Sequence, residues 1–162
     1  MKFADVIQTA DWKAEKHVPA ITAPVAVKAG EKFVVEVSVG KEIAHPNTTE
    51  HHIRSIKLYF KPEAGKFAYE VGSYDFSAHA ESVDGANKGP VLSEPTAQVA
   101  LKLTGSGTLL AVAYCNIHGF WESRLPELLA DQEWDFFLEK ARYIPQPAER
   151  TWQIILESAA AV

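Results

Sequence analysis

Apolar and polar residues alternate in several short runs between residues 25 and 115, as in β-strands that bury one face. Residues 33–39 form one such run, and apolar residues also recur at every second position over residues 56–60 and 97–103. Residues 108–113 are almost entirely apolar, which predicts a buried strand. Turn sequences rich in glycine and charged residues separate these runs. Several short strands with regular turns predict a mainly β fold, an antiparallel β-sandwich.

The spacing of apolar residues becomes helical after residue 124 and continues, with an interruption at two prolines, to the end of the chain. We therefore predict a sandwich domain over residues 1–124 and a C-terminal helical extension over residues 125–162. The extension carries more apolar surface than one helix face can bury, so we expect it to add to a homo-oligomer interface. A helical hairpin whose two apolar stripes cover each other is the alternative.

Composition narrows the classes of function. Apolar residues make up 47% of the 162 residues, which is enough for a core. The chain has 16 Lys and Arg against 21 Asp and Glu, and a formal charge of −5 argues against nucleic acid as the main partner. The sequence contains neither a signal-peptide pattern nor the roughly 20 consecutive apolar residues of a membrane span. We expect a cytoplasmic protein that binds neither nucleic acid nor membranes.

Residues that could bind a metal gather in separate segments. Cys115, the only cysteine, forms a C-x-x-H pair with His118, and two ligands three residues apart on a tight turn can face one metal. His45 and the pair His51-His52 flank a polar loop that can direct both of its ends toward one point. Neighbouring strand residues point to opposite sides, so at most one of His51 and His52 can bind the same metal.

The residues alone do not decide between His51 and His52. His52 shares its parity with the apolar positions of residues 56–60, so we expect it to pack inward. His79 lies outside every candidate ligand segment, and we interpret it as structural.

Three kinds of metal site compete for this set of donors. Structural zinc closes its shell with four ligands, which would leave a histidine unused. A copper-binding electron carrier of the cupredoxin type would use two histidines, one cysteine and usually an axial methionine, but the only methionine is Met1. A five-coordinate iron would use every ligand and leave one position open for a substrate. The extra histidines therefore favour iron.

With their neighbours, these segments resemble the one-iron superoxide reductases, or neelaredoxins. The motifs are E-K-H-V-P at residues 15–19, H-P-N-T-T-E-H-H-I-R at residues 45–54 and Y-C-N-I-H-G-F-W-E at residues 114–122. The resemblance covers about residues 1–124 and implies an immunoglobulin-like sandwich that binds one iron per chain. The matching ligands are four equatorial histidines and one axial thiolate: His17, His45, His51, His118 and Cys115.

The resemblance also implies an activity, the one-electron reduction of superoxide to hydrogen peroxide, with an external electron donor such as rubredoxin. In this family the residue matching Lys16 attracts the anionic substrate, and the residue matching Glu15 occupies the sixth position of ferric iron. On the residues alone, Glu15 and Lys16 are equally consistent with two solvated charges. Because Cys115 is the only cysteine, the sequence contains no four-cysteine iron domain like that of desulfoferrodoxins, and it resembles the single-centre class.

Overall fold

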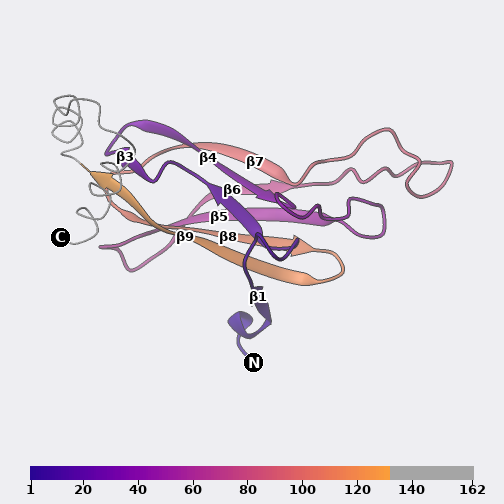
Figure 1. Ribbon diagram of the computed structural model, residues 1–162, viewed down its shortest axis with the longest axis horizontal. Coiled ribbons are helices and arrows are strands. Elements are labelled where there is room, and N and C mark those ends of the chain that lie inside the picture. Colours follow the sequence, from indigo (N-terminus) through magenta and orange to yellow (C-terminus); the bar gives the residue numbers. More distant parts are fainter. Residues whose placement is uncertain (132–162) are drawn as a thin grey trace, which may run out of the picture. The chain divides into compact units, whose positions relative to one another are not determined.

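The computed structural model describes the backbone of residues 1–131 and the side chains of residues 1–125 (Figure 1). This part of the chain consists of one short 3-10 helix and a series of strands. In chain order they are η1 (Phe3–Val6), β1 (Ile7–Thr9), β2 (Pro19–Thr22), β3 (Ala26–Lys28), β4 (Lys32–Val39), β5 (Ile53–Pro62), β6 (Tyr69–Asp75), β7 (Thr96–Lys102), β8 (Gly107–Cys115) and β9 (Gly119–Asp131).

The strands form two sheets. The larger sheet has the order β1-β9-β8-β5-β6, with β3 also pairing with β9, and the smaller sheet has the order β2-β4-β7. The pairings among β5, β6, β8 and β9 and those within the smaller sheet are antiparallel. The short strands β1 and β3 instead run parallel to β9, so the predicted purely antiparallel arrangement is wrong at these two positions.

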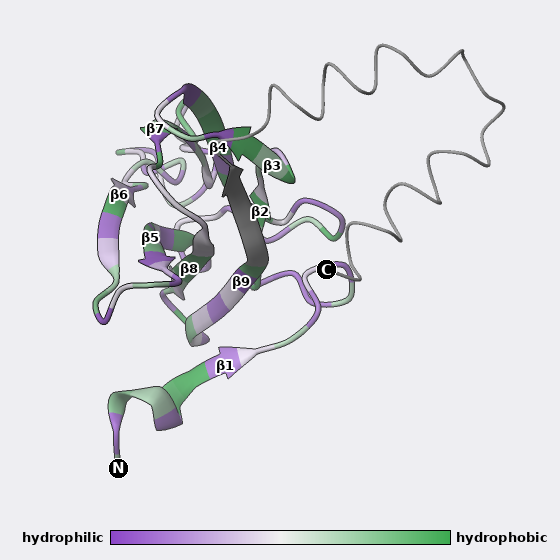
Figure 2. Cartoon of the chain, turned by 90° about the vertical axis from the view of Figure 1, so that its left-hand side faces the viewer, coloured by the Kyte–Doolittle hydropathy of each residue, from purple (hydrophilic) through white to green (hydrophobic). Residues whose placement is uncertain are grey.

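The two sheets share one hydrophobic core. Val35 and Val37 from the smaller sheet and Ile56, Leu58 and Leu109 from the larger sheet belong to the same buried cluster, and each is at most 1% exposed. Full burial of an aliphatic side chain of this size contributes about 1.5–3 kcal/mol. Figure 2 shows bands of hydrophobic and hydrophilic residues interspersed along the strands, as expected of strands with one buried face.

The predicted strand runs are confirmed, with one difference. Residues 33–39 and 56–60 fall on β4 and β5, and residues 97–102 of the third run fall on β7, with Leu103 just after its end. The apolar run at residues 108–113 lies in β8, where buried and half-buried residues alternate along the whole strand. One side of β8 is therefore less covered than its composition suggested.

The helical prediction is wrong for residues 125–131, because β9 continues to Asp131. Leu125 pairs with Leu109 of β8 and is half-buried against the core, so sheet pairing overrides the helical spacing at this position. The rest of the predicted extension, and the oligomer interface expected there, lie outside the described residues. No helix among the described residues is long and apolar enough to cross a membrane.

The ends of two central strands define the place where the site forms. Cys115 at the end of β8 pairs with Ile53 at the start of β5 and with Gly119 at the start of β9. The loops that precede β5 and join β8 to β9 therefore meet at this end of the larger sheet.

Candidate metal centre

Five donor side chains converge at this end of the sheet. One ligand atom from each of His17, His45, His51 and Cys115 lies within 4.8 Å of the others. The Nδ1 atom of His118 adds a fifth donor, 3.0 Å from Nε2 of His17 and 3.2 Å from Nε2 of His51. The Cys115 Sγ atom lies 3.6 Å from the same Nδ1. The structure thus brings together all five predicted ligands, although they come from three separate segments.

The strand ends fix the thiol and the turn that follows it. Cys115 is fully buried, and it ends β8 in a position where the sheet holds its backbone on both sides. The turn to β9 places His118 at the surface, and Gly119 adopts a φ of +75°, which glycine tolerates without strain. This geometry lets a C-x-x-H pair point both side chains at one location.

His45 is held by its own neighbour and by a close backbone approach. Its Nδ1 donates to the Pro46 carbonyl at 2.6 Å, which leaves Nε2 as the atom with a free lone pair. That Nε2 is buried and has no hydrogen-bond partner among the described residues. Burial lowers the pKa of His45 to about 4, so the ring is neutral near pH 7. A buried, neutral and unpartnered imidazole nitrogen is the form in which histidine binds a metal.

The backbone of Gly40 packs against His45. A Cβ atom at Gly40 would lie 2.8 Å from the backbone nitrogen of His45, and Gly40 has a φ of +86°. Only glycine satisfies both conditions without a shift in the chain.

His17 is oriented by two neighbours. Its Nδ1 donates to Oε1 of Glu15 at 2.6 Å, and its ring stacks on Trp121 with a centroid distance of 5.0 Å and an interplanar angle of 16°. The hydrogen bond from His17 lowers the pKa of Glu15. Because Nδ1 carries the proton, Nε2 of His17 presents its lone pair to the cluster.

These donors have more lone pairs than protons. In the neutral rings of His17 and His45 the single proton is on Nδ1, which leaves both Nε2 atoms with lone pairs, and His118 Nδ1 has at most one proton to share between the nitrogens of His17 and His51. Burial also lowers the pKa of His51, which favours the neutral form of that ring. A bound cation would accept these lone pairs and so remove the repulsion between them. A set of imidazoles with one thiolate suits a transition metal such as iron. The residues present therefore fit a bound iron.

Lys16 lies close to the donors. Its positive charge is among the causes that lower the pKa of His45 and of His51, behind burial in both cases. The residue is half-buried and directly precedes His17 in the chain. A cation here can act on an approaching anion.

The structure separates His51 from His52. His51 turns toward His118, whereas His52 is 5% exposed and donates from Nδ1 to the Thr48 carbonyl at 2.8 Å. The inward packing of His52 is confirmed, but parity is not its cause. A register shift between Ile53 and Ser55 interrupts the strand pattern, and His52 lies before β5 begins.

Asn116 has a role that the sequence analysis missed. Its Oδ1 accepts the backbone N–H of His52 at 2.9 Å, and its Nδ2 donates to the Glu50 carbonyl at 2.8 Å. The residue beside Cys115 thus ties the C-x-x-H turn to the histidine loop. The only feature of the sequence that could have indicated this role is the position of an amide side chain between the two ligands of the C-x-x-H pair.

Comparison with known proteins gives the family. The model of the desulfoferrodoxin family matches residues 9–124. The chain belongs to this family. A neelaredoxin from Megalodesulfovibrio gigas is 60% identical to it over 123 residues, which cover 76% of this chain and 95% of that protein. A superoxide reductase from Pyrococcus furiosus is 52% identical over 122 residues, covering 75% of this chain and 96% of that protein.

Solved structures agree with these relatives. The reduced form of the superoxide reductase (neelaredoxin) from Archaeoglobus fulgidus aligns with a TM-score of 0.71 and 53% identity. The alignment covers 76% of this desulfoferrodoxin-family chain and 98% of that chain. The mainly β fold with two sheets is thus the fold of a superoxide reductase.

Proposed function

We propose that this protein is a superoxide reductase, an oxidoreductase that reduces superoxide to hydrogen peroxide at one iron per chain. The observation that carries the proposal is the convergence of four imidazoles and one buried thiol, with Nε2 of His45 buried and unpartnered. Relatives that match nearly their whole length to this chain, named superoxide reductase or neelaredoxin, support the same activity.

We propose His17, His45, His51, His118 and Cys115 as the residues that hold the iron. When bound, iron supplies a reversible one-electron couple and an open position at which superoxide can be reduced. The thiolate of Cys115 would add electron density from a fully buried position, where water does not weaken its charge.

The chain's own charged residues act on the substrate and on a ligand. Lys16 is placed to attract superoxide, an anion, and to organise water that delivers protons. Glu15 holds the Nδ1 proton of His17 and so fixes which nitrogen faces the metal. The predicted role of Glu15 at the sixth position of the iron stays a prediction, and it requires the carboxylate to leave His17.

The reaction needs one electron and two protons for each superoxide converted to hydrogen peroxide. An external donor must return the electron, and we propose a small electron-transfer protein such as rubredoxin. The predictions of a homo-oligomer, of a cytoplasmic location and of a part in defence against oxidative stress also stay predictions.

A copper-binding electron carrier is not favoured. A blue-copper site uses two histidines, whereas four converge here. Metal analysis separates the two cases, since copper without binding of added ligands would support the carrier. Iron whose spectrum shifts with azide or cyanide supports an open position.

The stoichiometry of turnover tests the reaction. A reductase takes its electron from a donor, whereas a dismutase recovers it from a second superoxide. We expect the iron-loaded protein to consume about one electron from a donor per superoxide, with little oxygen released. Sustained superoxide removal without a donor would contradict the proposal.

A further inference from the structure

The loop that joins two of the proposed ligands is short and has little regular structure. This ligand loop, residues 46–50, joins His45 to His51. Its internal order comes mainly from Thr48, whose backbone N–H donates to the His51 carbonyl and whose Oγ1 accepts the His51 N–H, both at 3.0 Å. These bonds shape one turn, but they do not hold the loop against the rest of the domain.

Asn116 supplies one connection to the rest of the domain through the Glu50 carbonyl, and a second loop, which contains none of the proposed ligands, supplies several more. This outer loop, residues 76–95, joins β6 to β7 and packs along the ligand loop. Asn87 is its main point of contact. The Asn87 Oδ1 atom accepts the Thr49 backbone N–H at 2.8 Å and the Thr49 hydroxyl at 3.0 Å, and its Nδ2 donates to Glu50 at 2.8 Å. The Asn87 N–H donates in return to Thr49 Oγ1 at 3.0 Å.

The backbone of Asn87 is adapted to this contact. Its φ is +61°, a left-handed conformation that asparagine tolerates better than most residues. The side chain is otherwise exposed, so burial does not account for its placement. Four hydrogen bonds to two residues of the ligand loop do account for it.

His79 makes a second connection, from inside the protein. It is 2% exposed, and each ring nitrogen lies 2.8 Å from an oxygen: Nε2 from the Phe76 carbonyl and Nδ1 from Oδ1 of Asn47 in the ligand loop. The amide nitrogen of Asn47 donates to the Ser93 carbonyl at 3.0 Å. Residues of the outer loop therefore contact both the amide oxygen and the amide nitrogen of Asn47. The His79 carbonyl also lies 3.1 Å from the Thr49 hydroxyl, whose single proton it shares with Oδ1 of Asn87.

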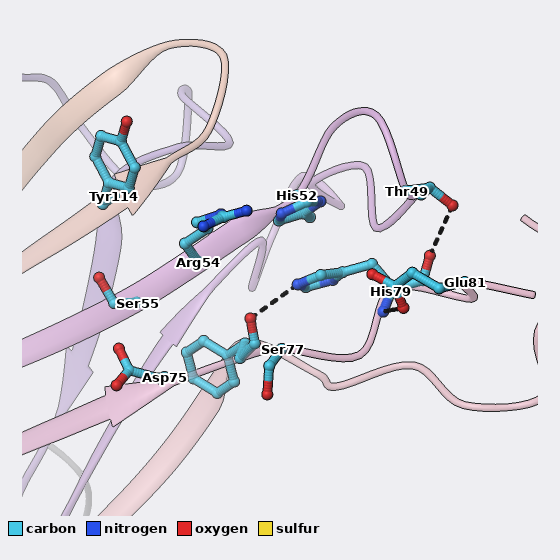
Figure 3. Close-up of a pocket in the computed structure, with 10 residues that line it drawn as sticks. Thr49, His52, Arg54, Ser55, Asp75, Ser77, His79, Glu81 and Tyr114 are labelled. Atoms are coloured by element: carbon cyan, nitrogen blue, oxygen red, sulfur yellow. Dashed lines mark hydrogen bonds between the residues drawn. The ribbon is translucent and has the colours of Figure 1, made fainter. Parts of the chain in front are cut away.

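The ring of His79 also supports the residue next to a ligand. It stacks face to face on His52 with a centroid distance of 3.6 Å and an interplanar angle of 7°. Figure 3 shows both rings on the wall of one pocket, with Thr49 beside His79. His52 directly follows His51, so the stack fixes the point where the ligand loop enters β5.

We propose that His79 and Asn87 are positioning residues, which hold the ligand loop so that His45 and His51 face the metal before it binds. Loosening the loop would leave the donors present but no longer preorganised, and metal binding would then have to order them. The inference rests on the proposed function only in taking His45 and His51 as ligands.

Titration of the metal-free, full-length protein with Co²⁺ tests this role, because cobalt reports coordination through its visible spectrum. Asn87→Gly removes the side-chain contacts but keeps a backbone suited to positive φ, and His79→Phe keeps a stacking ring but removes both ring nitrogens that face Asn47 and Phe76. We expect the Co²⁺ dissociation constant to rise about tenfold in each variant, as for residues that support metal ligands. The visible bands should also change as one histidine is lost from the coordination.

Two further variants distinguish positioning from general destabilisation. Val83→Gly places an added glycine at a fully exposed site of the same loop, and it should bind Co²⁺ as the unmodified protein does. The double variant Asn87→Asp, Glu50→Gln keeps the acceptor for Thr49 and a donor–acceptor contact between positions 50 and 87, so it should restore most of the affinity. Because Asn87 is exposed, its variants should fold even if His79→Phe does not.

A Co²⁺ dissociation constant for Asn87→Gly within about twofold of that for Val83→Gly, with an unchanged spectrum, would overturn the proposal. Failure of the Asn87→Asp, Glu50→Gln variant to restore binding would do the same. The readout does not involve superoxide, so the outcome is independent of the turnover stoichiometry that tests the reductase activity.

Discussion

The carboxylate of Glu15 fixes the ring of His17 from the side away from the metal centre. Oε1 lies 2.6 Å from Nδ1 and 3.2 Å from the backbone nitrogen of the same residue. One carboxylate oxygen thus accepts two hydrogen bonds from a residue two positions along the chain. The contact supports a role for Glu15 in orienting a ligand, beside the role at the sixth position that family resemblance implies.

Glu15 variants should separate these two roles. Glu15→Ala leaves the His17 Nδ1 proton without its acceptor, so we expect Co²⁺ affinity to fall about tenfold. Glu15→Gln keeps an oxygen acceptor and should keep most of that affinity. Both variants should change the spectrum of the oxidised iron protein, while the fast reaction with superoxide stays largely intact. Equal Co²⁺ affinity in Glu15→Ala and the unmodified protein would exclude the orienting role.

Cys115→Ser tests the proposed thiolate ligand. The thiol is fully buried and 3.6 Å from Nδ1 of His118, which places its sulfur among the imidazole donors. We expect the oxidised iron protein to show a visible thiolate-to-iron charge-transfer band and the serine variant to lack it. The check is an absorption spectrum of each protein at matched iron content. Survival of the band in the variant would mean that Cys115 does not bind the iron.

Lys16→Ala tests electrostatic attraction of the substrate. The charge of Lys16 reaches His45 and His51, so its loss should slow the second-order reaction with superoxide by roughly threefold to tenfold. The rate should also depend less on ionic strength, because a charge that salt would screen is absent. Pulse radiolysis over a range of salt concentrations measures both effects.

Lys66→Ala is the matched control for that experiment. Lys66 lies in the turn between β5 and β6, at the opposite end of β5 from the site. The ten residues of β5 span about 30 Å, well beyond the screening length in physiological salt. Lys66→Ala should therefore leave the rate and its salt dependence unchanged. Equal effects of the two substitutions would show that only net charge matters.

The stability of the metal-free protein should depend on His45. Burial lowers its pKa to about 4, so the unfolded chain binds a proton at this residue at pH values where the folded chain does not. The free energy of unfolding should therefore fall as pH decreases from about 6.5 to about 4. Below that range His45 should cause no further loss of stability. Urea unfolding at several pH values measures the slope. His45→Gln should show a shallower slope, and an identical slope would contradict the depressed pKa.

The sequence predicted the strands well because their apolar alternation reflects burial directly. Ile56 and Leu58 recur at period two and are fully buried in β5. The same reasoning failed at Leu125, whose apolar neighbours happen to recur at helical spacing. Its pairing with Leu109, sixteen residues earlier, decides its structure, and local spacing carries no information about a pairing partner.

The candidate ligands could be named from the sequence, but their supports could not. The C-x-x-H pair and the motif around His45 carry the resemblance to a known family. The contacts of Asn87 with Thr49 and of Trp121 with His17 join residues far apart in the chain. No periodicity or short motif marks such contacts, because they depend on how loops fold over one another.

Gly40 offers a sharp test of how the backbone positions His45, because Gly30 provides a matched control. Both residues have positive φ, +86° at Gly40 and +79° at Gly30, so alanine at either position should cost about 1–2 kcal/mol of stability from backbone strain. Only at Gly40 does a Cβ meet the chain, 2.8 Å from the His45 nitrogen, whereas nothing lies within 4 Å of a Cβ at Gly30.

Gly40→Ala must therefore shift His45, and we expect it to weaken Co²⁺ binding by about tenfold or more and to lower iron content. Gly30→Ala should lose a similar amount of stability from strain but bind Co²⁺ with unchanged affinity. Chemical unfolding and cobalt titration of the two metal-free variants supply the comparison. If both variants bind cobalt equally well, the close approach of Gly40 to His45 does not position the ligand. If both lose affinity equally, the loss follows from reduced stability and not from displacement of His45.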